Sequence, residues 1–251
     1  MKSIQAGLRI LSLFKDASTP LGVMDVAQAA GLTKSHASRI LSALRDTGYL
    51  AQDPRTRRYS VGIESFSIGI RFVAESPITR AALPIMRGCS ESTGHSVFIS
   101  VRDGSVCRHI LAFEGRHFED TQWRVGVPLA LHATASGKAL VAFSPNESAT
   151  PAAQLELRRL TPKTITDPCQ WHGELEMVRG RGWAEARGET VPGLAACAVP
   201  IFGYRECLVA AFGIVAPQHA LTAASVPATV TELHVAARRL SYTLGARAYP
   251  F

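Results

Sequence analysis

The stretch Asp25–Leu50, DVAQAAGLTKSHASRILSALRDTGYL, determines the architecture of the N-terminal part of the chain. Gly31 follows a segment of helical pattern and is suited to end it, because glycine adopts the left-handed conformation at little cost. Thr33 is a good N-cap for a further helix, which we expect to run through Asp46 and to stop near Gly48. The spacing predicts two short helices joined by a tight turn.

The second of these helices has two unlike faces. Its apolar side chains recur at i, i+3, i+4 and i+7, a spacing that packs one face of a helix on its neighbours; they are Ala37, Ile40, Leu41 and Leu44. The opposite face is polar and basic and consists of Lys34, Ser35, Ser38, Arg39, Ser42 and Arg45. Such a helix fits the major groove of DNA, where serine can donate or accept hydrogen bonds and arginine can bridge guanine O6 and N7.

The flanking segments extend this unit. Upstream, apolar residues at helical spacing predict a first helix to about Lys15, and the segment Asp16–Pro20 breaks it. Downstream, the Pro-containing segment Asp53-Pro54-Arg55-Thr56 separates residues 49–52 from residues 57–61, which predicts a hairpin with a basic tip. The predicted DNA contacts of the helix and the hairpin are Thr33, Lys34, Ser35, His36, Ser38, Arg39, Ser42, Arg55, Arg57 and Arg58.

The net charge is unevenly distributed along the chain. The whole chain carries +7, and residues 1–62 alone hold nine Lys or Arg against four Asp or Glu. Residues 63–251 hold eighteen against sixteen. A compact basic unit suits a polyanionic partner, although one arginine by itself is equally an ordinary solvated charge. The order of tight turn, capped basic helix and basic hairpin favours double-stranded DNA as the partner.

The remaining composition predicts a cytoplasmic protein without a metal or a cofactor. The five cysteines are an odd number and lack a CxxC pair, which fits a reducing cytosol. No apolar run reaches the roughly 20 residues needed to span a bilayer, so we expect no membrane partner. The eight histidines are scattered, Gly137-Lys138 lacks the spacing of a phosphate loop, and Ser136 lacks a nucleophile elbow. We therefore expect no enzymatic activity.

Beyond residue 62 the pattern changes twice. Residues 63–76 have apolar positions at roughly helical spacing and end at Ser76-Pro77, which suits a linker helix. Residues 77–251 combine helical stretches with hairpins rather than repeated βαβ units, so we predict an α+β domain. The expected domains are 1–62, 63–76 and 77–251. The expected elements of the last domain are a helix at 79–92, strands at 96–102, 106–113, 196–202 and 207–215, and a closing helix at 229–244.

Six motifs resemble the isocitrate lyase regulator (IclR) family of bacterial transcription factors. They are SIQAGLRILSLF at 3–14, the stretch at 25–50 quoted above, DPRTRRYSVG at 53–62, RVGVPLALHATASGKAL at 124–140, LTPKTITDP at 160–168 and RGRGWAEARGETVPGLAACAVPI at 179–201. The resemblance implies a winged helix-turn-helix, a linker helix and a GAF-like effector-binding domain with an antiparallel sheet flanked by helices. It also implies a homodimer formed through the DNA-binding domain and linker, or a homotetramer formed through the effector domains.

The same resemblance places an effector pocket beside residues 134–137. Effectors of the family are often small carboxylates or aromatic acids, and backbone N–H groups at a helix start can hold their carboxylate. Four places that are polar in the family hold Ala186, Ala196, Gly213 and Val215 here, so we expect an effector with an apolar or aromatic body. A degenerate pocket without a ligand is the alternative. The expected effector-binding residues are Phe98, Ala133, Thr134, Ala135, Ser136, Gly137, Ala186, Glu189, Ala196, Cys197, Gly213 and Val215.

These features predict a ligand-responsive transcriptional regulator of a catabolic operon, whose two reading heads recognise a roughly palindromic operator. Two other classes stay open on the sequence alone. An enzyme fused to a winged helix domain would need a converging nucleophile and base or a metal cluster, which the motifs do not supply. In a protein-interaction module the winged helix would bind protein instead of DNA. Loss of operator binding on replacement of Ser35 or Arg39 by alanine, with the fold intact, would argue against this class.

Overall fold

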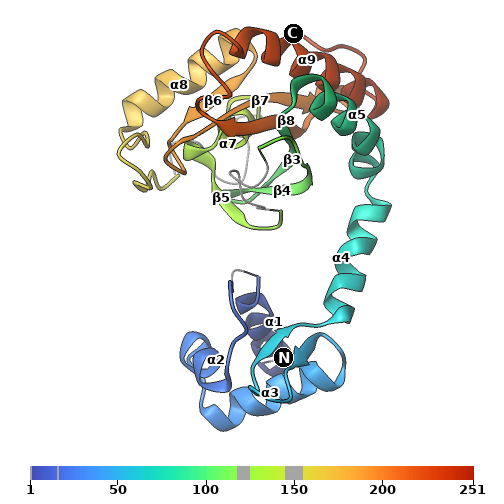
Figure 1. Cartoon of the computed structure of the whole chain (residues 1–251), viewed down its shortest axis with the longest axis vertical. Coiled ribbons are helices and arrows are strands. Elements are labelled where there is room, and N and C mark those ends of the chain that lie inside the picture. Colours follow the sequence, from blue (N-terminus) through green and yellow to red (C-terminus); the bar gives the residue numbers. More distant parts are fainter. Residues whose placement is uncertain (1, 16, 118–124, 145–154) are drawn as a thin grey trace. The chain divides into compact units, whose positions relative to one another are not determined.

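A computed structural model describes residues 2–15, 17–117, 125–144 and 155–251 of the chain (Figure 1). The chain divides into two compact units, Met1–Ser76 and Pro77–Phe251, and each has a hydrophobic core of its own. The combination of helices with antiparallel strands confirms the predicted α+β class. Among the described residues, no helix is both long and apolar enough to cross a membrane.

The first unit combines three packed helices with a two-stranded hairpin and a further helix. Its elements are α1 (Lys2–Leu13), α2 (Val23–Ala30), α3 (Lys34–Asp46), β1 (Leu50–Gln52), β2 (Tyr59–Val61) and α4 (Ile63–Glu75). Gly31 closes α2 in the left-handed conformation at φ 63°, and the Thr33 hydroxyl opens α3 by accepting the N–H of His36 at 3.3 Å. The buried core consists of Ile10, Phe14, Val26, Ala27, Ala30, Ala37, Leu41, Leu50 and Tyr59.

The hairpin is attached to the rest of this unit at both ends. Tyr59 exchanges two backbone hydrogen bonds, of 2.8 and 2.9 Å, with Leu21 in the loop before α2. Gly62 follows β2 and passes so close to Gly48 that a Cβ on Gly62 would lie 2.2 Å from the Gly48 carbonyl oxygen. This close approach lets α4 begin directly after the hairpin.

The second unit is a six-stranded antiparallel sheet in the order β5-β4-β3-β8-β7-β6, with helices on both faces (Figure 1). Its strands are β3 (Ser96–Asp103), β4 (Val106–Phe113), β5 (Pro128–Ala130), β6 (Ala184–Arg187), β7 (Leu194–Phe202) and β8 (Leu208–Pro217). Its helices are α5 (Pro77–Thr93), α7 (Ala135–Ala142), α8 (Pro168–Arg181) and α9 (Val226–Thr243), with 3-10 turns η1 (Leu131–Ala133) and η3 (Tyr204–Glu206). Helices α5 and α9 pack on one face, and α7 and α8 lie on the other.

Alternation along the central strands gives each face of the sheet its own core. On β7, Cys197 and Val199 pack toward α5 and α9, whereas Ala198 packs toward α7. The same alternation continues on β8, where Phe212 lies on the first face and Ala211 on the second. The sheet therefore separates a side held by α5 and α9 from a side that faces α7.

The sequence pattern located the four long strands but missed helix α8 and the two short strands β5 and β6. The strand β7 begins at Leu194 rather than at 196, and α9 begins at Val226 rather than at 229. Helix α8 was not predicted, although its start is readable: Asp167 accepts the N–H of Gln170 at 2.8 Å, and Pro168 follows in the first turn. The strands β5 and β6 are too short to produce a clear alternating pattern.

Candidate nucleic-acid interface and ligand pocket

The outward face of α3 presents basic and hydroxyl side chains to solvent. Burial of Ala37 and Leu41 against α1 and α2 fixes the rotation of the helix about its axis. Neither Lys34 nor Arg39 has a hydrogen-bond or ion-pair partner among the described residues. Of the predicted reading residues on this helix and its cap, the structure exposes Thr33, Lys34, Ser35 and Arg39, and it partly buries His36, Ser38 and Ser42.

Arg45 lies on the same helix but is engaged inside the unit. Its guanidinium donates to the carboxylate of Asp46, at 2.6 and 2.9 Å, and to Oε1 of Gln52 at 3.1 Å. Gln52 in turn donates to the carbonyl of Arg57 at 2.9 Å. Arg45 therefore joins the end of α3 to the hairpin, and it differs in this respect from Arg39.

The hairpin tip is shaped by Asp53. Its Oδ1 accepts the backbone N–H groups of Arg55 and Thr56 at 2.7 and 2.8 Å, and these bonds hold the pKa of the carboxyl below its ordinary value. Arg57 takes a left-handed conformation, φ 57°, which is uncommon for a residue with a side chain. The side chains of Arg55 and Arg57 are exposed and have no partner among the described residues.

Arg58 differs from the prediction of a free phosphate contact. Its Nη1 donates to the carbonyl of Pro20 at 2.7 Å and lies 3.1 Å from Oδ2 of Asp25. The same Asp25 oxygen accepts the N–H of Gly22 at 2.8 Å, which caps α2. Arg58 thus attaches the hairpin to the start of α2, because its guanidinium has partners within the fold.

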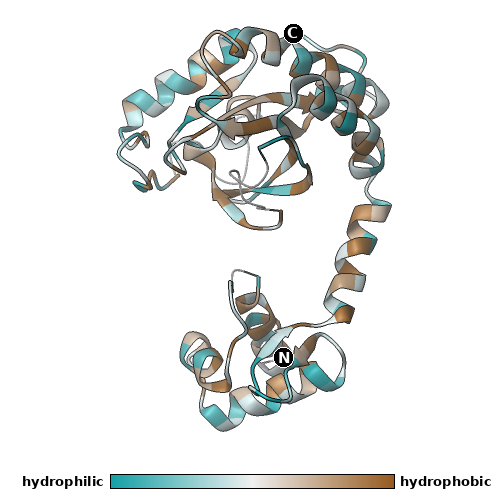
Figure 2. Cartoon of the chain, viewed as in Figure 1, coloured by the Kyte–Doolittle hydropathy of each residue, from teal (hydrophilic) through white to brown (hydrophobic). Residues whose placement is uncertain are grey.

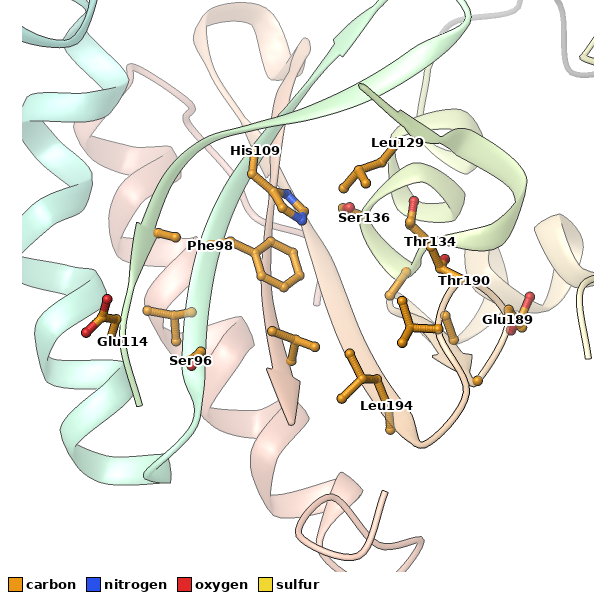
Figure 3. Close-up of a pocket in the computed structure, with 18 residues that line it drawn as sticks. Ser96, Phe98, His109, Glu114, Leu129, Thr134, Ser136, Glu189, Thr190 and Leu194 are labelled. Carbon is orange, nitrogen blue, oxygen red and sulfur yellow. The ribbon is translucent and has the colours of Figure 1, made fainter. Parts of the chain in front are cut away.

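In the second unit a cavity of about 100 Å³ lies between the sheet face that carries α7 and the loop from β6 to β7 (Figure 3). Of the predicted effector-binding residues, the cavity is lined by Phe98, Thr134, Ala135, Ser136, Ala186, Glu189 and Val215. Further lining residues, which the sequence did not indicate, are Ser96, Val97, His109, Ala112, Glu114, Leu129, Gly188, Thr190, Val191, Leu194 and Ala195. Arg124, which begins the motif at 124–140, lies outside the described residues.

The start of α7 forms one wall of the cavity. Thr134 caps the helix: its hydroxyl donates to the carbonyl of Ala130 at 2.9 Å and accepts the N–H of Gly137 at 3.1 Å. The N–H groups of Ala135 and Ser136, in the first turn, have no acceptor within the helix. These two groups, with the positive end of the helix dipole, make this wall suitable for a carboxylate.

Ala133 and Gly137 support this wall without lining the cavity. The carbonyl of Ala133 accepts the hydroxyl of Thr190 at 2.6 Å, which joins η1 to the loop from β6 to β7. A Cβ on Gly137 would lie 2.2 Å from the carbonyl oxygen of Leu131, so only glycine fits where α7 turns back on η1. Both residues were predicted to bind the effector, and both instead position the residues that reach the cavity.

A buried lysine lies behind the start of α7. The Lys138 side chain is 2% exposed, and its Nζ donates to Glu189 Oε1 at 2.8 Å, to the Glu185 carbonyl at 2.9 Å and to Glu174 Oε1 at 3.3 Å. The second carboxylate oxygen of Glu189, Oε2, is buried and has no hydrogen-bond partner in the described part of the chain. Burial raises the pKa of Glu189, and Lys138 and the nearby N–H of Arg187 oppose that rise.

Two aromatic rings form the opposite part of the cavity. The ring of Phe98 stacks on His109 with centroids 4.3 Å apart and planes at 30° (Figure 3). Ser100 Oγ lies 2.7 Å from His109 Nδ1 and orients the imidazole. Sequence reasoning missed His109, because a single histidine on a predicted strand gives no signal of what it faces.

Three further predicted effector-binding residues do not line the cavity either. Cys197 is wrong because it lies on the other face of the sheet, where burial raises the pKa of its thiol to about 12. Gly213 is covered by the Phe98 ring, since a Cβ there would lie 2.4 Å from Phe98 Cε2. Ala196 pairs with Val215 on the cavity face, but its side chain stops short of the cavity.

Comparison with known proteins shows that both units match models of the same protein family. Residues 70–242 match the family model described as bacterial transcriptional regulator IclR C-terminal, and residues 3–54 match the IclR helix-turn-helix domain. The glycerol operon regulatory protein of Streptomyces griseus is 30% identical over 251 residues, which cover 98% of this chain and 97% of that protein.

Solved structures show the same architecture. The IclR protein of Thermotoga maritima superposes with a TM-score of 0.78 at 26% identity, over 98% of this chain and 100% of that one. An IclR homologue from Microbacterium hydrocarbonoxydans, solved in complex with 4-hydroxybenzoate, has a TM-score of 0.81 at 23% identity, over 96% of this chain and 98% of that one.

Proposed function

Because the chain belongs to the IclR family of bacterial transcriptional regulators, we propose that it binds a roughly palindromic operator as a homodimer and responds to a small organic acid. One observation supports the proposal above all. The first unit presents Lys34 and Arg39 on an outward helix face, where neither has a partner among the described residues, and the second unit contains a cavity with a helix start in its wall. The relatives are named as regulators, so the enzyme alternative is set aside.

The surface proposed to read DNA is the outward face of α3 with the hairpin tip. The N-terminal turn of α3 carries Lys34 and Ser35, which suit the contacts to base edges made by the second helix of helix-turn-helix proteins. Arg55 and Arg57 extend the basic surface to the hairpin and suit contacts with phosphates. Arg58 is left out of this surface because Asp25 and Pro20 engage it.

A homodimer is supported by the apolar surface of α4. No residue of this helix is buried within the chain, yet five of its large apolar side chains are exposed, which Figure 2 shows as hydrophobic colouring along the helix; they are Ile63, Phe66, Ile68, Ile70 and Phe72. Ile4 and Leu8 of α1 are exposed as well. Exposed apolar patches of this kind mark interaction sites. Two copies of the first unit would bury them and set the spacing of two reading heads.

The cavity supports an acid with a compact apolar body as the effector. The N–H groups of Ala135 and Ser136 suit a carboxylate, and much of the remaining wall is apolar, with Leu129, Val191, Leu194 and Val215. The neighbour that holds 4-hydroxybenzoate shows an acid bound by a protein of this fold.

Effector binding would act by differential affinity. A ligand shifts the balance between arrangements of the two reading heads only as far as it binds one arrangement more tightly. The acid would contact both α7 and the loop from β6 to β7. It would therefore favour the conformation of the second unit in which these two segments lie together, and with it the arrangement of reading heads that accompanies this conformation.

The test combines a genomic footprint of the purified protein with binding measurements. Footprinting names the operator, and fluorescence anisotropy then gives its affinity with and without candidate acids from the pathway of the neighbouring genes. We expect paired half-sites and an affinity that changes at least tenfold with one acid. The absence of any footprint, with the fold intact, would refute DNA recognition and favour the protein-interaction module. Unpaired half-sites would refute the dimer.

A further inference from the structure

Arg57 occupies a position at the hairpin tip that glycine would fill without strain. Its φ of 57° lies in the left-handed region, where the backbone crowds the Cβ of any side chain. A hairpin loop that closes in this conformation ordinarily carries glycine or asparagine at such a place. The arginine is therefore kept at a cost in backbone energy, which indicates a use for its side chain.

The backbone on both sides of Arg57 is fixed by the rest of the first unit. Its N–H donates to the carbonyl of Asp53 at 2.9 Å, and its carbonyl accepts Nε2 of Gln52 at 2.9 Å. Gln52 is held in turn by Arg45 at 3.1 Å, and the next residue, Arg58, attaches the loop to the start of α2. The Arg57 side chain itself is exposed and has no partner in the described part of the chain. A rigid tip thus holds one cation at a fixed place relative to α3.

A phosphate contact alone does not need so fixed a backbone, because a long side chain on a flexible loop reaches phosphates from many positions. The minor groove is different, since it is only about 6 Å wide and admits one extended side chain from a narrow tip. Over A·T-rich sequence the groove narrows further, and its stronger negative potential attracts arginine. A guanidinium group enters such a groove more readily than an ammonium group because it is less strongly hydrated.

We propose that Arg57 is a specificity-determining residue, which enters the minor groove beside each half-site and selects A·T base pairs there. The bond from Arg45 to Gln52 attaches the hairpin to the C-terminal end of α3. With α3 in the major groove, a tip attached at that end meets the adjacent minor groove. This proposal rests on the proposed function, because it names the sequence that the same DNA-binding surface prefers.

Three duplexes test the proposal on the unmodified full chain. They share the footprinted operator and differ only in the base pairs that flank each half-site, which are A·T, G·C or inosine·C. Inosine lacks the 2-amino group of guanine, so the inosine·C pair resembles A·T in the minor groove and G·C in the major groove. By fluorescence anisotropy at fixed salt, we expect the A·T and inosine·C duplexes to bind at least fivefold more tightly than the G·C duplex.

Each other outcome excludes a part of the proposal. Equal affinity for all three duplexes would overturn the selection of A·T pairs, while the proposed DNA recognition stands. Tight binding of the A·T duplex alone would place the contact in the major groove and would overturn the proposal as well. Failure of all three duplexes to bind would count against both proposals, because the proposed function itself requires operator binding.

Two variants assign the preference to one side chain. Arg57→Gly removes the side chain and relieves the backbone, so we expect the preference for A·T flanks to fall below twofold and the thermal midpoint to stay unchanged or rise. Arg55→Ala is the matched control, because it removes another exposed arginine of the same tip and should keep the fivefold preference. A preference retained in Arg57→Gly, or lost in Arg55→Ala, would contradict the role of Arg57. A lower midpoint in Arg57→Gly would contradict its strained placement.

Discussion

The ring of Phe98 fills the space that a side chain at position 213 would need. A Cβ on Gly213 would lie 2.4 Å from Phe98 Cε2 and 2.6 Å from Cζ. The two residues face each other across the paired strands β3 and β8. The absence of a side chain at 213 is therefore coupled to the presence of an aromatic ring at 98, and the cavity owes part of its small volume to this pair.

Gly213→Ala should destabilise the second unit by about 1–3 kcal/mol, because the added methyl group overpacks the site. Combining it with Phe98→Leu should recover part of this loss, since leucine lacks the ring atoms that clash. Recovery should be incomplete, because the carbonyl oxygen of Cys197 also lies 2.8 Å from the added Cβ. Chemical denaturation of the two single variants and the double variant measures the coupling. Strict additivity would show that the two positions are independent.

Arg39→Ala should weaken binding to the footprinted operator by about 1–3 kcal/mol, because its guanidinium is free to reach a base edge. Arg45→Ala is the matched control on the same helix. Arg45 is engaged by Asp46 and Gln52, so its loss should change affinity less. Fluorescence anisotropy at fixed salt measures both, with circular dichroism to confirm the fold. A larger loss for Arg45→Ala than for Arg39→Ala would show that the reading face is misassigned.

The three hairpin arginines should differ in how much each contributes to the salt dependence of DNA binding. Replacing Arg55 or Arg57 by alanine should lower the slope of log K against log salt by about 1 on a mixed-sequence duplex, because a protein that neutralises one phosphate fewer releases fewer counterions on binding. Arg58→Ala should change this slope little and should instead lower the thermal stability of the first unit, because it removes the bonds to Asp25 and Pro20. An unchanged slope in all three variants would exclude the hairpin from DNA contact.

Acid should destabilise the second unit through His234. Burial lowers its pKa to about 4, with Arg238 adding to the effect, and its Nδ1 lies 3.0 Å from the hydroxyl of Tyr249. In the unfolded chain the His234 imidazole takes up a proton near pH 6.5, whereas in the folded chain it does so only near pH 4. The free energy of unfolding therefore falls as the pH drops from 6.5 to 4. The loss attributable to His234 is about 3 kcal/mol at most.

This acid sensitivity can be assigned with two variants. His234→Gln should flatten the dependence of unfolding free energy on pH between 6.5 and 4, and His172→Gln, at an exposed position on α8, controls for the exchange of a histidine for glutamine. Urea titrations at a series of pH values measure the slopes. Identical slopes in the unmodified protein and His234→Gln would remove His234 as the cause.

Phe66→Glu should disrupt the proposed dimer, because it places a charge on the apolar surface of α4. Phe66 is 61% exposed in the single chain, and burial of a phenylalanine contributes about 1.5–3 kcal/mol. We expect the dimer dissociation constant to rise at least tenfold in sedimentation equilibrium. Arg71→Glu, about 140° away around the same helix, reverses a charge on the polar side, where Arg71 pairs with Glu75, and should have a smaller effect. Equal association of all three proteins would show that α4 is not the interface.

Local signals predicted the reading unit well. Gly31, Thr33 and the apolar spacing of α3 each act within a few residues of themselves, so the sequence shows the helices, their caps and the exposed face. The exception is Arg58, whose partners Pro20 and Asp25 lie more than thirty residues away in sequence. A contact between residues so far apart in the chain produces no periodic pattern in the sequence.

The cavity was less predictable for the same physical reason. Strand alternation shows that residues 196 and 197 face opposite ways, but not which of them meets a cavity. Lys138 is buried because carboxylates from α8 and from the loop after β6 converge on it, and only the folded chain brings them together. The contact between Phe98 and Gly213 likewise joins two strands that are far apart in sequence.

The exposed apolar surface of α4 has a consequence for how much regulator a cell must make. Under the proposed dimer, the reading heads are paired only after two chains have met, and at low abundance the number of pairs grows with the square of the number of chains. Halving expression would then reduce operator-competent protein about fourfold by mass action. The switch would respond to gene dosage as well as to its effector.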